Sequence, residues 1–307
     1  MVAAANAYRE GGCDGVVAFG GGSALDAGKA VRLFVKRPEL KLAAYDWAAD
    51  WSGLAPCVCV PTTAGTGSEV GRSSVLVPEG KKTKGVFFQP NLLANLVILD
   101  PEVTRALPPG LTAATGADAL THCIESYTCP VFHPMCDGIA LEGISLVVKA
   151  LPRAFKDGND LEARGHMLVA AAMGAVAFQK DLGTAHSLAH ALSAVSGMHH
   201  GAANALVLPF VMRWNAPRKP GLYRRVGIAC GVNDIVNASD PEADRLTIKF
   251  VGRFLDALDL KPGLRARGVR DDQLEELADA AFADPCHTTN VVPVTREVLL
   301  GLLKEAM

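Results

Sequence analysis

The apolar pattern of the sequence changes near Asp100, and this change most restricts the folds that the chain can adopt. Upstream, short runs of branched apolar residues alternate with segments of helical period, which is typical of α/β structure. Downstream, the strand-like runs stop, and Ala, Leu and Met recur at helical spacing. Because 307 residues exceed what one core usually serves, we predict an α/β domain over residues 1–107 and an all-α domain over residues 108–307.

The expected elements follow from these periods. The predicted strands cover 16–19, 57–60 and 96–99, with a hairpin over 75–88 that turns at Glu79-Gly80. The predicted helices of the first domain cover 1–11 and 23–35. Those of the second domain cover 111–128, 137–157, 160–178, 184–196, 202–213, 218–230, 241–258 and 272–282.

Composition and charge exclude several classes of partner. The formal charge is -2, and the only tight basic cluster, Lys81, Lys82 and Lys84, is too small for a nucleic-acid footprint. No apolar run approaches 18 residues, so we expect no contact with a membrane and a cytoplasmic location. The eight cysteines form no CxxC pair, which favours free thiols in a reducing compartment.

A glycine-rich turn follows the first predicted strand directly, in Gly20-Gly21-Gly22-Ser23. Glycines allow a diphosphate to approach the backbone closely, and the N-terminus of the next helix offers N–H groups to an anion. Ser23 is expected to be the N-cap and a phosphate donor. An ordinary strand-to-helix turn explains the pattern equally well, since it is not the G-x-G-x-x-G fingerprint.

A second loop of small polar residues, Pro61 to Val70, follows the next predicted strand. Its hydroxyl groups suit contacts with phosphate, ribose or carboxamide, and the carboxyl ends of strands are where α/β sheets bind ligands. A polar surface loop is the alternative. Together the two loops predict a Rossmann-like nucleotide-binding domain.

Asp118 and His122 are four residues apart in a predicted helix, so their side chains lie on one face, one turn apart. This spacing suits the binding of one cation, although a core histidine explains the pair at least as well. A histidine cluster further along the chain favours a metal, because structural histidines rarely crowd within fifteen residues. Its members are His186, His190, His199 and His200. Six candidates exceed the ligands of one site, so at least one has another role.

The order of these motifs resembles that of the iron-containing (group III) alcohol dehydrogenases. The matching motifs are GGGS-x-x-D-x-x-K, PTTAGTGSE, G-x-DAL-x-H-x-IE, H-x-x-x-H and H-G-x-x-N. The segments 137–143 and 177–183 are similar to the branch of 4-hydroxybutyrate dehydrogenase-type enzymes.

The resemblance implies a specific set of roles. The metal ligands would be Asp118, His122, His186 and His200, with His190 beside the nicotinamide and substrate as the catalytic proton relay. The cofactor-binding residues would be Gly21, Gly22, Ser23, Asp26, Thr62, Thr63, Thr66 and Lys84. The metal would be Fe²⁺ or Zn²⁺, and the cofactor NAD or NADP. The substrate would be a small alcohol or aldehyde, including ω-hydroxy acids, and the protein a homo-oligomer such as a homodimer.

Family members normally carry a substantial segment before the point where this chain starts, so the resemblance implies a truncated nucleotide-binding domain. This departure motivates one rival function, a non-catalytic or partner-dependent paralogue. A second rival is a metal-dependent lyase similar to dehydroquinate synthase. A lyase of that kind needs Lys and Arg around its metal, and the segments beside these histidines contain only Lys180.

Overall fold

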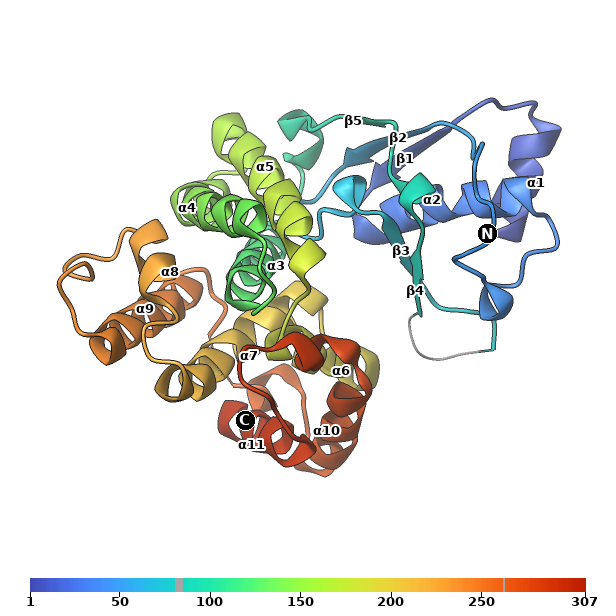
Figure 1. The fold of residues 1–307 in the computed structure, drawn as a ribbon. Coiled ribbons are helices and arrows are strands. Elements are labelled where there is room, and N and C mark those ends of the chain that lie inside the picture. The colour runs from blue at the N-terminus through green and yellow to red at the C-terminus, as the bar shows by residue number, and fades with distance from the viewer. Residues whose placement is uncertain (81–84, 262) are drawn as a thin grey trace.

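The chain has an α/β part and a helical part, which lie side by side in the ribbon of Figure 1. The structure is a computed structural model that describes residues 1–80, 85–261 and 263–307. No helix among these residues is long and apolar enough to span a membrane. The α/β fold of the first part and the helical fold of the second are confirmed; the division into domains 1–107 and 108–307 stays a prediction.

The α/β part is built on a small parallel sheet. Within the described residues its strand order is β1-β2-β5, formed by β1 (Val16–Gly20), β2 (Cys57–Pro61) and β5 (Leu96–Val97). β1 and β2 run in register from Val16 opposite Cys57 to Gly20 opposite Pro61. The two strands therefore end at the same edge, which brings the two glycine-containing loops together.

Helix α2 (Gly22–Lys36) packs against this sheet, and α1 (Val2–Glu10) packs against α2. Ala18 of β1 is buried beneath α2, whereas Val17 and Phe19 of the same strand are 69% and 59% exposed. Two apolar side chains of β1 are therefore exposed on the face of the sheet away from α2. The predicted hairpin is confirmed as the antiparallel pair β3 (Ser73–Leu76) and β4 (Gly85–Phe88).

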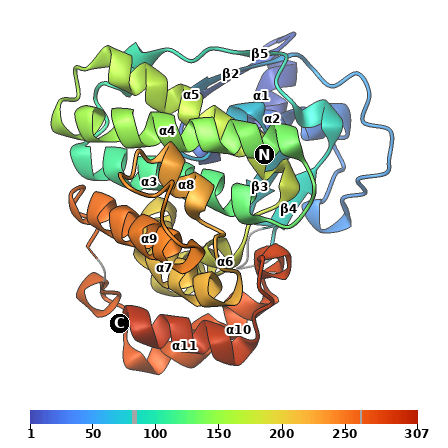
Figure 2. The ribbon, with the colours of Figure 1, turned by 60° about the vertical axis from the view of Figure 1, so that its left-hand side comes forward.

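The helices of the second part pack around the largest hydrophobic core of the described residues (Figures 1 and 2). They are α3 (Pro109–Thr128), α4 (Pro134–Lys156), α5 (Leu161–Ala177), α6 (Thr184–Ser196), α7 (His200–Asn215), α8 (Arg224–Ala229), α9 (Asp240–Asp256), α10 (Leu274–Ala283) and α11 (Arg296–Ala306). Helix α3 is buried along most of its length, since α4, α5 and α7 all contact it. Its side chains are therefore held on several sides.

Several predicted boundaries are wrong. The expected helix 218–230 is only α8, because Pro220 and the left-handed backbone of Gly221 (φ 84°) delay its start. The strand expected over 96–99 pairs only at 96–97. Helix α11 was not predicted, although Thr295 caps it by accepting a hydrogen bond from the Val298 N–H.

Candidate metal centre and cofactor loops

Helix α3 supplies the first pair of candidate ligands, Asp118 and His122. Their spacing of four residues brings His122 Nε2 to 3.9 Å from Asp118 Oδ1. Both side chains are almost completely buried. Burying a carboxylate beside an imidazole is costly unless both have strong partners. The interpretation of His122 as a core histidine does not explain why Asp118 is buried next to it.

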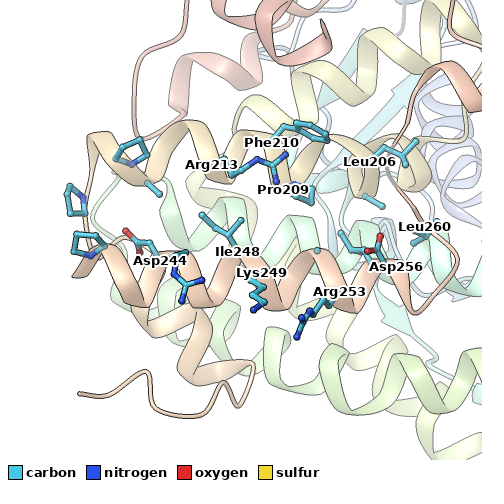
Figure 3. A pocket seen from close by; sticks show the side chains of 18 residues that line it. Leu206, Pro209, Phe210, Arg213, Asp244, Ile248, Lys249, Arg253, Asp256 and Leu260 are labelled. Carbon is cyan, nitrogen blue, oxygen red and sulfur yellow. The ribbon is translucent and has the colours of Figure 1, made fainter. Parts of the chain in front are cut away.

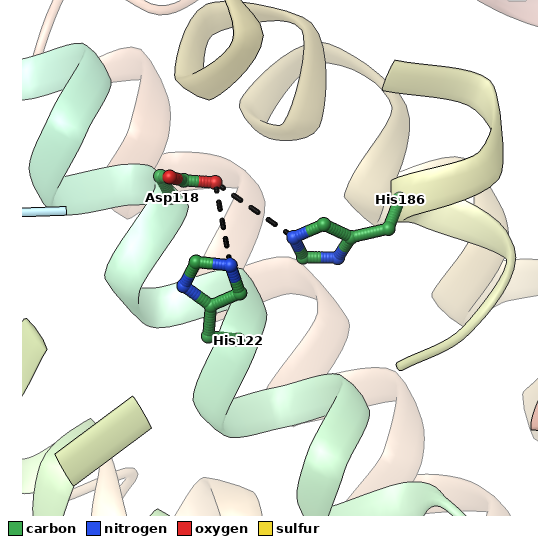
Figure 4. Close-up of side chains that lie close together, drawn as sticks. All are labelled: Asp118, His122 and His186. Atoms are coloured by element: carbon green, nitrogen blue, oxygen red, sulfur yellow. Dashed lines mark ion pairs between the residues drawn. The ribbon is translucent and has the colours of Figure 1, made fainter. Parts of the chain in front are cut away.

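Helices α6 and α7 bring two further imidazoles to the same carboxylate. His186 Nε2 lies 3.8 Å and His200 Nε2 3.4 Å from Asp118 Oδ1. The rings of His122 and His186 stack with centroids 4.7 Å apart. Figure 4 shows Asp118, His122 and His186 pointing toward one another from α3 and α6. The four residues that the family resemblance selected therefore converge on one point.

Close contact between α7 and α3 depends on Gly201. A Cβ at this position would lie 2.1 Å from the Ala114 carbonyl oxygen, so a larger residue would force the two helices apart. Because His200 precedes Gly201 at the start of α7, this contact brings His200 beside Asp118.

Glu125, one turn beyond His122, fixes the orientation of His186. Its carboxylate accepts hydrogen bonds from the backbone N–H groups of Gly183 (3.0 Å) and Ala185 (2.7 Å), and from His186 Nδ1 at 2.7 Å. A proton held on Nδ1 leaves Nε2 as the nitrogen that faces Asp118. This carboxylate–histidine pairing is the usual support of a histidine that binds a metal.

Asn204 on α7 supports the same group. Its Nδ2 donates to Asp118 Oδ1 at 2.8 Å and lies 3.2 Å from His186 Nε2 and 3.3 Å from His200 Nε2. In the sequence, Glu125 and Asn204 stand out only as members of the family motifs. Three-dimensional contacts are needed to assign them supporting roles.

The pKa shifts of Asp118 and His186 suit a metal. Burial works to raise the pKa of Asp118, but His122, His200, His186 and the Asn204 hydrogen bond lower it to about 2. Burial and the neighbouring imidazoles lower the pKa of His186 well below its ordinary value. An ionised carboxylate and neutral imidazoles are the forms that bind a divalent cation. One oxygen and three nitrogens fit Zn²⁺ and Fe²⁺ alike.

His190 lies next to this cluster but is held differently. Its ring stacks on that of His200, with centroids 5.0 Å apart, and its Nδ1 lies 2.8 Å from Asp284 Oδ2. The side chain is 37% exposed, in contrast to the buried His186. Its placement suits a group that reaches both the cluster and solvent. His199, the remaining candidate, is an exposed residue that precedes α7.

The two glycine-containing loops meet at the edge of the sheet. Thr62 N donates to the Gly20 carbonyl at 2.9 Å, and a Cβ at Gly22 would lie 2.7 Å from Thr66 Oγ1. A Cβ at Gly21 would lie 3.4 Å from Thr63 Oγ1. The candidate cofactor residues of both loops are thus brought together. Lys84 lies outside the described residues.

Ser23 and Asp26 take positions that the sequence did not predict. Gly21, not Ser23, is the N-cap of α2, so Ser23 lies in the first turn of the helix. Asp26 is buried, accepts a hydrogen bond from Ser68 Oγ at 2.6 Å and pairs with Lys29 Nζ at 3.4 Å. Asp26 therefore ties the first loop to the second, and its direct contact with a cofactor stays a prediction.

Lys29 stabilises the second loop through hydrogen bonds from inside the molecule. Its fully buried Nζ donates to the carbonyls of Ser68 (2.7 Å), Gly71 (3.3 Å) and Ser73 (2.5 Å). Burial lowers the pKa of Lys29, while Asp26 counteracts this effect. In the sequence, Lys29 stands out only as the last residue of the first motif.

Two openings differ in their relation to the cluster. A cleft of about 560 Å³ lies between the β3–β4 hairpin and α5, and it is lined in part by Phe178, whose ring centroid lies 5.0 Å from that of His122. A larger groove of about 800 Å³ runs between α7 and α9 (Figure 3). Leu206, Phe210 and Ile248 line that groove, and none of the clustered histidines does. No clustered histidine lines the smaller cleft either, but its wall at Phe178 contacts His122 of the candidate metal centre.

The chain thus combines two glycine-containing loops at one edge of a parallel sheet with a buried carboxylate–imidazole cluster. Residues 1–101 match the iron-containing alcohol dehydrogenase family, and residues 112–307 match the C-terminal part of the Fe-containing alcohol dehydrogenase family. The chain therefore belongs to the iron-containing alcohol dehydrogenase family.

Individual relatives agree with this assignment. The chain is 38% identical to 4-hydroxybutyrate dehydrogenase of Cupriavidus necator, over 99% of the chain and 80% of that protein. It is 36% identical to alcohol dehydrogenase 4 of Saccharomyces cerevisiae (strain ATCC 204508 / S288c), over 95% of the chain and 75% of that protein.

Solved structures show the same fold. The crystal structure of 1,3-propanediol oxidoreductase superposes with a TM-score of 0.95 at 31% identity, covering 100% of this chain and 80% of that one. Sulfoacetaldehyde reductase from Bifidobacterium kashiwanohense, in complex with NAD⁺, gives a TM-score of 0.88 at 28% identity, with coverages of 99% and 79%. These findings favour the dehydrogenase over both rival functions.

Proposed function

We propose that the chain interconverts a small alcohol and its aldehyde, with NAD or NADP as the hydride carrier and a divalent metal held by Asp118, His122, His186 and His200. The convergence of three imidazole nitrogens on Asp118 Oδ1, within 3.4–3.9 Å, carries this proposal. When bound, the cation supplies Lewis acidity that favours loss of the alcohol proton. In the oxidation direction the substrate carbon gives a hydride to the nicotinamide, and the hydroxyl oxygen gives up a proton.

Residues around the proposed metal hold its ligands in place and offer a route for the released proton. Glu125 and Asn204 hold His186 and Asp118 in place before substrate arrives, which reduces the reorganisation needed during reaction. We propose that the substrate enters through the cleft beside Phe178. His190 would carry the released proton toward solvent, because it is partly exposed and an imidazole ring can both accept and donate a proton.

The cofactor would lie across the two loops that meet at Gly22 and Thr66. The backbone N–H groups at the start of α2 suit its diphosphate. The resemblance assigns Gly21, Ser23, Thr62 and Thr63 to the same site, and their position on these loops supports that role.

The lyase alternative requires cations beside the metal to hold a phosphorylated substrate, and the sequence segments around the clustered histidines offer only Lys180. Lys180, the one candidate near the histidines in sequence, is buried and forms an ion pair with Asp137 on α4. It is therefore engaged within the helical part and not offered to a phosphorylated substrate.

Activity assays test the proposal directly. Anaerobically purified protein, loaded in turn with Fe²⁺ and Zn²⁺, is assayed with NADH and NADPH against short aldehydes and ω-oxo acids, and with NAD⁺ and NADP⁺ against the corresponding alcohols. We expect metal-dependent turnover with at least one cofactor. His200→Ala should lose bound metal and turnover together, whereas full activity of this variant after exhaustive chelation would refute the ligand set.

A further inference from the structure

Asp284 is the one carboxylate among the described residues that bonds to the ring of His190, and no motif of the sequence points to it. It lies at the end of α10 and begins the short helical turn η9 (Pro285–Thr289), so it is far from His190 in sequence but close in space. The contact is short, with 2.8 Å between Asp284 Oδ2 and His190 Nδ1.

The two oxygens of Asp284 have different partners. Oδ1 accepts hydrogen bonds from Ser187 Oγ and from the Cys286 N–H, both at 2.9 Å. Ser187 Oγ in turn accepts from the His287 N–H at 2.8 Å, so its own hydrogen is directed to Asp284. Because two donors hold Oδ1, the carboxylate presents Oδ2 to His190 in a fixed orientation.

An acceptor facing Nδ1 requires a proton on that nitrogen. Burial works to raise the pKa of Asp284, but the hydrogen bonds from His190, Cys286 and Ser187 keep it below the ordinary range, so the group is an ionised acceptor. The proton on Nδ1 leaves Nε2 as the basic nitrogen of the ring.

We propose that Asp284 is a positioning residue, which holds His190 in the tautomer that carries its proton on Nδ1 and thus presents Nε2 as the proton acceptor. The proposal rests on the proposed function of His190 as the proton relay. Ser187 and the backbone of Cys286 act through Asp284, since they fix which oxygen faces the ring.

A competing role for the same residues is a second metal site. Potential ligand atoms of His190, Asp284 and Cys286 all lie within 4.8 Å of one another. A cation bound between Asp284 and Nδ1 would replace the proton that joins them, so the two roles are mutually exclusive.

Asp284→Asn is the sharpest test, because it keeps the shape of the side chain. The donors Ser187 and Cys286 retain the amide oxygen at the Oδ1 position, so the new NH₂ group faces Nδ1 and forces the ring proton to Nε2. A comparable change in a Ser-His-Asp triad lowers kcat by about 10⁴-fold. We expect kcat to fall by roughly 10²- to 10⁴-fold here, with KM changed by no more than about threefold.

The tautomer is measured separately from activity. ¹⁵N-histidine spectra of the Zn²⁺-loaded protein, with His190 assigned through His190→Gln, should show Nδ1 protonated in the wild type and Nε2 protonated in Asp284→Asn. Asp271→Asn is the matched control, since Asp271 is exposed and pairs only with Arg265 in the described residues. The control should leave kcat and the tautomer unchanged.

Each outcome separates the two hypotheses. An unchanged tautomer in Asp284→Asn would overturn this inference, and so would a second metal equivalent that disappears in this variant. A reversed tautomer with wild-type kcat would support the positioning role of Asp284 and overturn the relay role of His190. A wild type that binds metal but never turns over would refute the proposed function, while the spectra would still test Asp284.

Discussion

In the helical part, the candidate ligands project from α3, α6 and α7 into the main core, and Glu125 and Asn204 hold them there. In the α/β part, the candidate cofactor residues lie on backbone loops at the end of a small sheet, one face of which exposes Val17 and Phe19. A cation needs side chains fixed within tenths of an ångström, whereas a diphosphate is bound mainly by backbone N–H groups. Metal binding therefore depends on side chains of the helical part, and cofactor binding depends on loops of the α/β part. A variant should affect one kind of binding without the other.

The largest effect is expected from removal of the central carboxylate. Asp118→Ala takes away the atom on which the three imidazoles converge. Loss of one electrostatic stabiliser costs about 10²- to 10³-fold in kcat, and here the metal is lost with it, so we expect at least roughly 1,000-fold lower activity. NADH binding, followed by fluorescence titration, should stay within about threefold of the wild type. A loss of NADH affinity as large as the loss of activity would show that cofactor binding depends on the metal centre.

A smaller effect is expected from the buried support of His186. Glu125→Gln places an NH₂ group among donors, because Gly183 N, Ala185 N and His186 Nδ1 all point at this side chain. We expect about 10- to 100-fold weaker metal affinity in competition with a chelator. Glu102→Gln is the control, since Glu102 forms an exposed pair with Arg105. Unchanged metal affinity in Glu125→Gln would contradict the supporting role.

Some members of the candidate site can be predicted from local sequence patterns, whereas others are brought in only by tertiary packing. The pair Asp118 and His122 follows from helical spacing, and the strand-loop-helix segments follow from local pattern. The approach of His200 depends on the contact of α7 with α3 at Gly201, which no local pattern specifies. Asp284 meets His190 only through the packing of η9 on α6, so sequence spacing gave no indication of it.

A moderate effect, confined to the α/β part, is expected from Lys29→Met. The change leaves the carbonyls of Ser68, Gly71 and Ser73 without their buried donor. We expect a loss of about 1–3 kcal/mol in the free energy of unfolding, measured in urea, with the metal content of the folded protein unchanged. Lys249→Met, at an exposed position on α9, should have no effect. Loss of metal from folded Lys29→Met protein would contradict the separation of the two parts.

The smallest effect is expected from Gly22→Ala. The added Cβ would lie 2.7 Å from Thr66 Oγ1, and Thr66 is exposed, so this side chain can move by a small amount. We expect the Kd for NADH to rise by about threefold to tenfold, which corresponds to roughly 0.7–1.4 kcal/mol. Gly138→Ala is the matched control, since nothing lies within 4 Å of a Cβ there. Tighter NADH binding in Gly22→Ala would show that the loop contact is not part of the cofactor site.

The position of the bound metal decides whether Asp118 and the three histidines form the metal centre. Crystals of anaerobically purified protein, measured at the absorption edge of the metal that they contain, give an anomalous difference map that locates each ion. We predict one peak per chain, about 2.0–2.3 Å from Asp118 and from the nearest ring nitrogens of His122, His186 and His200. A peak between His190, Asp284 and Cys286 with none at Asp118 would contradict the account.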